Sequence, residues 1–448
     1  MRRLVIALLA CIGLVGFSIS PADAELEADA NDHYVDETTL PFNPVEGFED
    51  SDRQWGVHQG AGYRYEVPSD WNGELVIWAH GYRGEENRLY FNPEEVPMRV
   101  WLLENGYAWA ASTYSQNSYS TGNAVTDTRK LGTLFRQSVD RPERVYIAGA
   151  SMGGHITAAS IERHPEYYDG AMPVCGVVGD FELFDYFLDY GLAAQQLAFG
   201  ESSFPIGPDF LASLPEIKAE FEAVEGGWPF LLNEKGEAFK QLTELRSGGD
   251  RPNFDEAWAF WNSGDFLFGL AVGDGTFGTS TKVAVTNRDV YYETDLIPGP
   301  SNAMEEALNE DIERVNLDRN ARRLYRGAAS VPLRGTITMP VMSLHNLGDL
   351  FVPFHNEVVY HDKVASHGKT DLLVQRAIRG TGHCEFSTAE YEESFSDLVD
   401  WVETGVKPEG DVVNDPAAVA AADYGCQFTD PTPGAHPFGT PCDDGEEG

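Results

Sequence analysis

The sequence predicts an α/β protein with a mostly parallel sheet and helices on both of its faces, and three observations predict it. Short apolar runs rich in β-branched residues alternate with helical patterns along the chain. One such run, Val145 to Ala148, leads into a serine set between glycines and then into a helical pattern. The alternation stops after about residue 180 and resumes near residue 331, which predicts a large insertion.

The expected elements are short, as is typical of strands buried on both faces. Strands are expected at residues 75–79, 107–111, 145–148, 171–175, 340–344 and 372–378. Helices are expected at residues 124–139, 156–163 and 388–404. The second of these helices ends before Pro165, because proline cannot continue a helix.

The chain is expected to divide into six segments around one core. They are a signal peptide at 1–24, an N-terminal extension at 25–60, the first half of the core at 61–180, a cap insertion at 181–330, the second half of the core at 331–405, and an acidic tail at 406–448.

The first 24 residues have the features of a cleaved leader. Arg2 and Arg3 precede an apolar run that ends at Phe17, and residues 22–24 read Ala-Asp-Ala, which fits an A-x-A cleavage site. Cys11 lies in a sequence that resembles a lipoprotein box, but cleavage there would cut the apolar run in its middle. We therefore expect cleavage after residue 24 and export to the extracellular space or the periplasm.

The composition excludes two classes of partner. The 448 residues include 72 acidic and 31 basic ones, for a formal net charge of −41, so nucleic acid would be repelled. No segment after the leader approaches the ~18 apolar residues that a membrane span needs. The mature protein is expected to be soluble, and no sequence feature indicates its oligomeric state.

Four cysteines remain after the leader, and an even number in an oxidising compartment predicts two disulfides. Cys426 and Cys442 enclose a loop rich in proline and glycine, so we expect a local bridge that contributes about 3 kcal/mol on the chain-entropy model. Elimination leaves Cys175 with Cys384, although four cysteines allow three pairings.

The serine lies in the pattern Gly-Ala-Ser-Met-Gly at residues 149–153. In a G-x-S-x-G turn the serine is exposed at the tip, because the glycines remove side chains that would collide as the strand reverses into a helix. The alternative is a glycine-rich packing turn, and the strand before the motif and the helix after it argue against that alternative. Ser151 is therefore the expected nucleophile.

A serine nucleophile needs a base, and an imidazole base needs an acceptor that holds its tautomer. His383 follows the expected strand 372–378, and Asp349 follows the expected strand 340–344. Both positions lie at the carboxyl edge of the sheet, where sites in parallel sheets form. We expect His383 as the base and Asp349 as the acid. Alternatives for the base are His80, His155 and His345, and the alternative for the acid is Asp180.

The negative oxygen of a tetrahedral intermediate needs two preorganised N–H donors. One is expected from Met152, which follows the serine, and the other from Tyr82 in the loop after the strand 75–79, with Gly81 as the alternative. A plain turn after that strand is the other interpretation of this loop.

No cofactor or metal site is expected. His355, Glu357, His361 and Asp362 lie close in sequence, but they lack the H-E-x-x-H spacing that places two imidazoles on one helix face. A solvated helix is the favoured interpretation. No G-x-G-x-x-G follows the first expected strands, so a dinucleotide site is not indicated.

These motifs together resemble the α/β-hydrolase superfamily across residues 60–180 and 331–405. The segments that carry the resemblance are the serine turn, His80-Gly81, Asp349-x-x-Val352-Pro353 and Gly382-His383. The resemblance implies the α/β-hydrolase fold with a cap inserted in the core, and the chain order Ser151, Asp349, His383 is the one expected of that fold.

Two details resemble narrower groups within that superfamily. Residues 149–154 are similar to the elbow of cutinase-like and polyester-degrading enzymes, which are secreted bacterial serine esterases. The pair His383-Cys384 resembles tannase and feruloyl esterase relatives, in which a cysteine beside the catalytic histidine is disulfide-bonded to one beside the serine. Ala150 stands before Ser151 here, so the partner of Cys384 would have to be Cys175.

The resemblance implies acyl transfer through an acyl-enzyme, and the leading hypothesis is a secreted hydrolase of small-molecule or polymeric carboxylic esters. One alternative is a secreted peptidase of the prolyl-oligopeptidase type on the same fold, although no propeller-like blade repeat is visible. Another is a binding module that keeps the fold without catalysis.

The insertion is rich in aromatic residues, and we expect a cap whose apolar side covers Ser151. Part of the aromatic set should form the core of the cap, and the remainder should line an acyl or aryl pocket. The set consists of Phe181, Phe184, Tyr186, Phe187, Trp228, Phe230, Trp258, Phe260, Trp261, Phe266 and Phe268.

Overall fold

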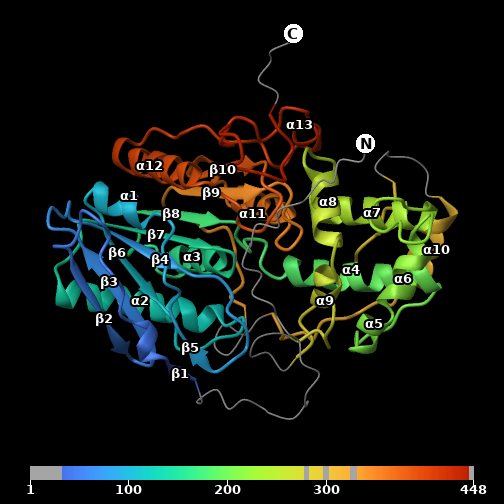
Figure 1. Ribbon diagram of the computed structural model, residues 1–448, viewed down its shortest axis with the longest axis horizontal. Helices are drawn as coiled ribbons and strands as arrows, with labels where there is room; N and C mark the ends of the chain where they lie inside the picture. The colour runs from blue at the N-terminus through green and yellow to red at the C-terminus, as the bar shows by residue number, and fades with distance from the viewer. Residues whose placement is uncertain (1–32, 277–281, 296–301, 323–329, 443–448) are drawn as a thin grey trace, which may run out of the picture. The chain divides into compact units, whose positions relative to one another are not determined.

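The computed structural model describes residues 33–276, 282–295, 302–322 and 330–442 (Figure 1). The expected signal peptide at 1–24, the start of the expected extension and residues 443–448 lie outside the described residues.

A mixed sheet of eight strands forms the centre of the described chain (Figure 1). Its strands are β2 (Asp52–His58), β3 (Ala61–Val67), β4 (Glu74–Ala79), β6 (Ala108–Ser112), β7 (Arg144–Ala150), β8 (Gly170–Val174), β9 (Val341–Asn346) and β10 (Leu373–Ile378). The strand order is β10-β9-β8-β7-β4-β6-β3-β2. The six strands from β10 to β6 run parallel, and β3 pairs antiparallel with β6 and with β2. A separate parallel pair joins β1 (Tyr34–Val35) to β5 (Arg88–Leu89). The predicted α/β class is confirmed.

The strand β2 corrects one expectation. Residues 52–58 were expected in a surface extension, but they form the edge strand of the central sheet. An edge strand has one neighbour, and its side chains are half-buried or exposed: Trp55 is 42% and Val57 is 47% exposed. The strand therefore lacks the continuous apolar run that revealed the central strands.

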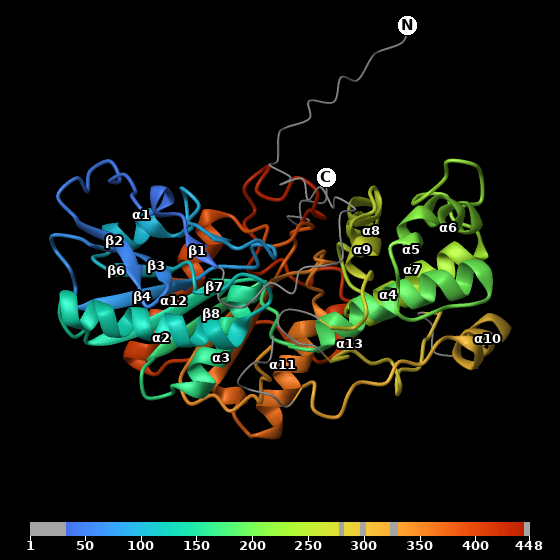
Figure 2. The same cartoon turned by 90° about the horizontal axis from the view of Figure 1, so that it is seen from below.

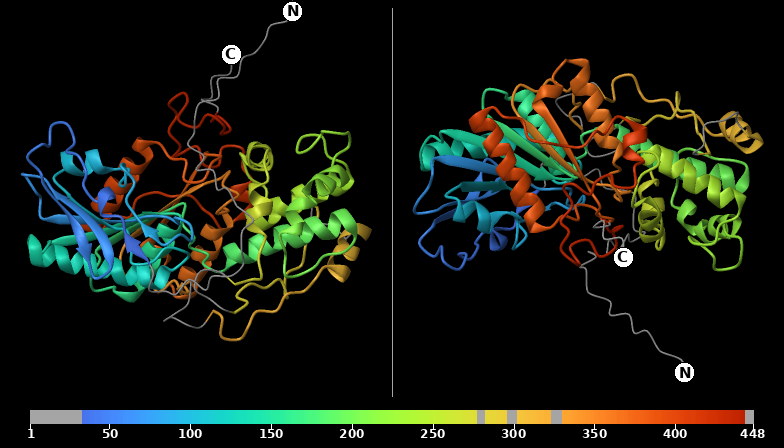
Figure 3. Two further views of the ribbon diagram at one scale, coloured as in Figure 1. Left: turned by 60° about the horizontal axis from the view of Figure 1, so that its bottom comes forward. Right: turned by 90° about the horizontal axis from the view of Figure 1, so that it is seen from above.

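Helices cover both faces of the sheet. One face carries α1 (Arg99–Glu104) and α12 (Thr388–Thr404), and the other carries α2 (Thr121–Ser138), α3 (Met152–Arg163) and α11 (His355–Ser366). The side chains of β4 are apolar on both faces, so both faces need a cover. Leu75 and Ile77 belong to the core under α2 and α3, whereas Val76 and Trp78 belong to the core under α12. From below, α2 and α3 lie in front of the strands (Figure 2), and from above α12 does (Figure 3).

The cap between β8 and β9 has a hydrophobic core of its own, which includes Phe239, Trp258 and Phe268. Two buried carboxylates in the cap accept hydrogen bonds from arginines: Asp189 from Arg246, and Asp185 from Arg322. The cap helices are α4 (Glu182–Phe199), α5 (Asp209–Ala212), α6 (Leu214–Phe221), α7 (Glu234–Ser247), α8 (Phe254–Asn262), α9 (Phe266–Leu270) and α10 (Ala303–Asp311).

The tail packs on the core and is stapled by a disulfide between Cys426 and Cys442. Its apolar residues Val419 and Tyr424 are buried against Leu347, which begins the loop after β9. The tail also contains α13 (Pro416–Val419), and two 3₁₀ helices lie elsewhere, η1 (Glu37–Thr39) and η2 (Thr370–Leu372).

The helix α11 corrects a second expectation, because Glu357 is buried rather than solvated. Its carboxylate accepts hydrogen bonds from Ser343 Oγ at 2.7 Å, Gln375 Nε2 at 2.6 Å and His345 Nδ1 at 3.1 Å. The network therefore ties α11 to β9 and β10. Burial alone would lower the pKa of His345, but the hydrogen bond and charge of Glu357 outweigh burial and raise that pKa.

This buried pair predicts a pH-dependent stability. Because the folded-state pKa of His345 is raised above 6.5, its contribution is complete below about pH 6.5 and is lost as the pH rises through the raised value. Glu357→Gln should lower the free energy of unfolding at pH 6, and its deficit relative to wild type should shrink by up to about 1.4 kcal/mol per pH unit above that.

Thermal and urea unfolding between pH 5.5 and 9 measure the deficit. Glu393→Gln is the matched control, because Glu393 is exposed on α12. A deficit that stays constant with pH would contradict the ion pair.

Candidate active site

The serine turn lies between β7 and α3 and has the strained backbone of an elbow. Ser151 has φ 61° and ψ −123°, which an L-residue rarely adopts. A Cβ on Gly149 would lie 2.6 Å from the carbonyl oxygen of Ala79, and one on Gly153 would lie 2.0 Å from it. Only glycine fits at either position, so the chain can reverse at Ser151. The Ser151 N–H is fixed by donating to the Val174 carbonyl at 3.0 Å.

The structure brings Asp349 and His383 together. His383 Nδ1 lies 2.6 Å from Asp349 Oδ2. The other carboxylate oxygen accepts the N–H groups of Phe351 and Val352, both at 2.9 Å, and Asp349 is fully buried. Because the carboxylate oxygens act as acceptors, Nδ1 is the ring nitrogen of His383 that carries a proton and donates it to Asp349. Nε2 is then free to accept a proton.

Two of the alternative bases have both ring nitrogens engaged elsewhere. His155 bonds Tyr119 Oη at 2.9 Å and the Val331 carbonyl at 2.6 Å. His345 bonds Glu357 and the Val352 carbonyl. Both imidazoles are fully buried and connect parts of the core.

The alternative acid, Asp180, is also engaged away from His383. Its carboxylate accepts from Lys363 Nζ at 2.7 Å, from the Leu333 N–H at 3.0 Å and from the Phe181 N–H. It therefore anchors the start and the end of the cap insertion to α11.

His80 has a role that sequence reasoning missed. Burial lowers the pKa of His80 well below its usual value, so the ring is neutral, and its Nδ1–H donates to the Gly81 carbonyl at 2.7 Å. Tyr114 stacks on the imidazole with ring centroids 4.1 Å apart. In a trans peptide the carbonyl and the N–H point in opposite directions, so this bond fixes the Tyr82 N–H pointing away from His80.

The expected oxyanion donors lie on the two segments that border Ser151. A Cβ on Gly81 would be 3.2 Å from Ser151 Cβ, so the backbone before Tyr82 passes directly beside the serine. Met152 is the first residue of α3, and its N–H is among the four that a helix leaves without an internal acceptor. The macrodipole of α3 favours negative charge at the same end.

The second disulfide joins Cys175, directly after β8, to Cys384, directly after His383. Cys384 Sγ lies 3.5 Å from His383 Nε2, so the bridge attaches the histidine loop to the sheet beside the serine elbow. Among the described residues, one group of three possible metal ligands lies together, formed by these cysteines and His383. Both sulfurs are joined to each other, so the group offers a metal only the imidazole.

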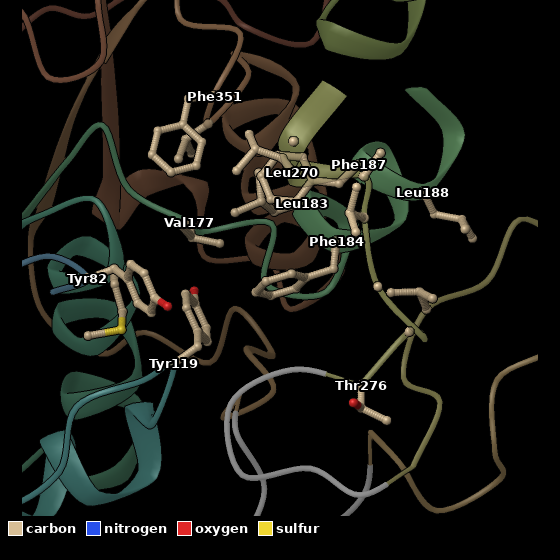
Figure 4. Close-up of a pocket in the computed structure, with 18 of the residues that line it drawn as sticks. Tyr82, Tyr119, Val177, Leu183, Phe184, Phe187, Leu188, Leu270, Thr276 and Phe351 are labelled. Carbon is tan, nitrogen blue, oxygen red and sulfur yellow. The ribbon is translucent and has the colours of Figure 1, made fainter. Parts of the chain in front are cut away.

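A cavity of about 330 Å³ opens beside Ser151 (Figure 4). Tyr82 and Tyr119 stand on one side of it, and side chains of the cap stand on the other. Among its described lining residues, Glu85 is the only one with a charged side chain. The core and cap residues that line it include Val177, Leu183, Phe184, Phe187, Leu270 and Phe351.

Only some of the aromatic residues of the cap line the cavity. Phe184 and Phe187 line it, whereas Trp258 and Phe268 belong to the core of the cap and Phe230 is 70% exposed. The Phe351 ring connects the cavity to the site, because its centroid lies 4.8 Å from that of His383.

Comparison with known proteins adds a family match over the elbow. Residues 105–202, which contain β7, the serine turn and α3, match the prolyl oligopeptidase family. With the sheet order, the strained serine and the Asp349–His383 pair, this match decides the superfamily. The protein is a hydrolase of the α/β-hydrolase superfamily. The predicted fold and the resemblance to the α/β-hydrolase superfamily are therefore confirmed.

Individual relatives of this α/β-hydrolase are distant. The o-phthalyl amidase of Xanthobacter agilis is 23% identical over 78% of this chain and 86% of its own. Feruloyl esterase B from Aspergillus oryzae is 13% identical over 80% and 82% of the two chains, with a TM-score of 0.46. Another esterase from Aspergillus oryzae is 13% identical over 80% of each chain, with a TM-score of 0.42.

The disulfide at the histidine loop predicts a selective loss of activity. Replacing Cys175 and Cys384 together by serine should lower kcat by about tenfold in a chain that still folds, because the loop loses its covalent attachment beside the elbow. Activity and thermal unfolding of the same sample measure the two effects.

The matched control is the double serine variant at Cys426 and Cys442. It should lose about 3 kcal/mol of stability on the chain-entropy model but less activity. Equal losses of kcat in the two variants, or free thiols at Cys175 and Cys384 in non-reducing peptide maps, would exclude the proposed role.

Proposed function

We propose that this protein is a secreted serine hydrolase that cleaves carboxylic esters through an acyl-enzyme. The observation that carries the proposal is the 2.6 Å contact of His383 Nδ1 with the buried Asp349, in the loops that follow β10 and β9. It leaves the Nε2 nitrogen of His383 available as a base at the edge of the sheet where the strained Ser151 follows β7.

In the proposed reaction Ser151 Oγ attacks the acyl carbon while His383 Nε2 takes the serine proton. The negative oxygen of the tetrahedral intermediate accepts from the N–H groups of Met152 and Tyr82. His383 then gives the proton to the leaving alcohol, and the acyl group stays on the serine. A water molecule, deprotonated by the same nitrogen, attacks the acyl-enzyme and releases the acid.

Two disulfides are compatible with the oxidising compartment that the proposal of secretion requires. No helix in the described ranges has the length and apolar character needed to cross a membrane.

The walls and the size of the cavity favour a substrate with an aromatic or medium-length acyl group, in a small-molecule or polymeric ester. Its walls are apolar and aromatic, and its volume of about 330 Å³ is at the small end of ligand sites. The amidase relative is named for an o-phthalyl group, which contains one aromatic ring.

Amide hydrolysis is the second candidate. The match to the prolyl oligopeptidase family and the amidase relative both favour it. The same serine, base and oxyanion donors would serve, since an amine leaves with the same proton that an alcohol would take.

Ser151→Ala should abolish hydrolysis in a folded protein, leaving less than about one part in a thousand of the wild-type kcat. Asp349→Asn should reduce kcat by up to about 10⁴-fold, because the neutral amide favours the wrong tautomer of His383. Hydrolysis of p-nitrophenyl benzoate and labelling by a fluorophosphonate probe measure both effects.

Asp180→Asn is the matched control and should retain wild-type labelling, since Asp180 binds Lys363 and backbone N–H groups rather than the base. A wild-type protein that stays unlabelled would indicate a binding module. If Asp180→Asn is the damaging change instead, the acid has been misassigned.

The cavity predicts selectivity for the acyl group. Benzoate and hexanoate esters should exceed acetate esters in kcat/KM, by up to about fourfold for each buried methylene. Phe184→Ala should remove much of this preference while leaving acetate hydrolysis near wild type, and Phe230→Ala, at an exposed position of the cap, should change neither.

Matched benzoyl esters and benzamides in the same assay separate the two candidate functions. A kcat/KM that falls steadily from acetate upward would exclude an acyl pocket in this cavity.

A further inference from the structure

The cap is bonded to the two loops that carry Asp349 and His383, through a short segment that runs from Arg251 to Trp261. Arg251 is buried, and its Nε–H donates to the Leu347 carbonyl at 2.8 Å, two residues before Asp349. Burial lowers the pKa of Arg251 to about 10, so the guanidinium stays charged at neutral pH and its bond to the loop is charge-assisted.

Asn253 makes the second connection, at the start of α8. Its Nδ2–H₂ donates to the Gly380 carbonyl at 2.9 Å and to Thr381 Oγ1 at 3.1 Å. Its Oδ1 accepts the Thr440 N–H at 2.7 Å, so the tail is joined to the same point. Asn253 is buried and has a left-handed backbone with φ 72°. A Cβ on Gly348 would lie 2.6 Å from Asn253 Nδ2, so a glycine is needed there for the approach.

Trp261 makes the third connection and is the one that joins both loops. Its indole N–H donates to the Gly348 carbonyl at 2.8 Å and to the Thr381 carbonyl at 3.0 Å. Gly348 directly precedes Asp349, and Thr381 lies two residues before His383. One donor therefore bridges the loop of the acid and the loop of the base.

The packing of the Trp261 indole also connects it to His383. Its ring contacts Phe266 and Phe351, with centroids 5.7 and 6.5 Å away. Phe351 in turn lies against His383 and lines the cavity.

We propose that Trp261 and Asn253 are positioning residues of the active site, which hold the Asp349 and His383 loops at the spacing that the Asp349–His383 bond needs. The cap then has two tasks: it walls the cavity, and it aligns the acid with the base. The inference rests on the proposed roles of Ser151, Asp349 and His383.

The chain offers a matched pair of variants. Trp258 lies one turn before Trp261 on α8, and its indole N–H donates to the Pro229 carbonyl at 3.0 Å, inside the cap. Trp258→Phe and Trp261→Phe therefore each remove one indole N–H that donates to backbone carbonyls, and both keep an aromatic ring. Only Trp261→Phe releases carbonyls of the two loops.

With p-nitrophenyl benzoate as substrate, Trp261→Phe should lower kcat by about tenfold and leave KM within about twofold. Trp258→Phe should keep kcat within about twofold, even if both variants lose similar thermal stability. The rate of labelling by the fluorophosphonate should follow kcat, because labelling needs the same aligned base.

A double-mutant cycle separates positioning from a general structural effect. If Trp261 acts by aligning Asp349 with His383, its tenfold effect on labelling should shrink to less than about twofold in the Asp349→Asn background. Asn253→Asp gives a second test, since it keeps the acceptor for Thr440 but places an oxygen opposite the Gly380 carbonyl. It should lower kcat and show the same coupling to Asp349→Asn.

Equal kcat in the two tryptophan variants, a change in KM alone, or a full tenfold effect in the Asp349→Asn background would overturn the inference. Ser151→Ala in the same series keeps the two proposals apart. Activity that survives Ser151→Ala refutes the proposed function, whereas its loss together with equal kcat in the tryptophan variants refutes only the positioning role.

Discussion

The Asp349 carboxylate is the group on which the rest of the site depends. It is fully buried, and a buried carboxylate without partners is unfavourable by several kcal/mol. Two of its three donors are N–H groups of its own loop, and the third is His383, which lies after a different strand. The interaction that satisfies the buried carboxylate therefore also orients the imidazole of His383. Backbone bonds of the two loops, from Leu347 to Ile378 and from Gly348 to Gly380, keep them adjacent.

The six parallel strands and the three proposed catalytic positions could be predicted because each has a local signal. A parallel strand buried on both faces is a short apolar run. The glycines around Ser151 are required because a Cβ at either one would lie 2.0 to 2.6 Å from the Ala79 carbonyl oxygen. Asp349 and His383 each follow such a run directly. The edge strand β2 lacked that signal because only one of its sides has a neighbour. Glu357 looked like a solvated acid because its partners lie on β9 and β10, 14 and 18 positions away, and no pattern within α11 shows that they meet it.

The connections between the cap and the loops have no local signal at all. Trp261 lies 87 and 120 positions from the carbonyls it binds, and Asn253 lies 187 positions from Thr440. In the sequence Trp261 looks like an ordinary member of an aromatic helix, and Asn253 looks like an ordinary polar residue before it. The aromatic residues of α4 also divide without a local signal. Phe184 and Phe187 line the cavity, whereas Tyr190 contacts Phe239 and Phe268 in the cap core, although the same spacing of three positions separates all three residues.

Two different kinds of interaction constrain His383, a disulfide on the core side and hydrogen bonds on the cap side. On the core side a disulfide attaches Cys384 to the end of β8, and on the cap side directional hydrogen bonds hold Thr381 and Gly380. The cavity wall, by contrast, is made of apolar side chains whose contacts have little directionality. Substitutions in that wall can change which group fits the cavity while Asp349 and His383 stay aligned. The cap can therefore change residues on its cavity wall while its contacts with the Asp349 and His383 loops stay fixed. This requires that the segment from Arg251 to Trp261 keeps its hydrogen bonds to those loops.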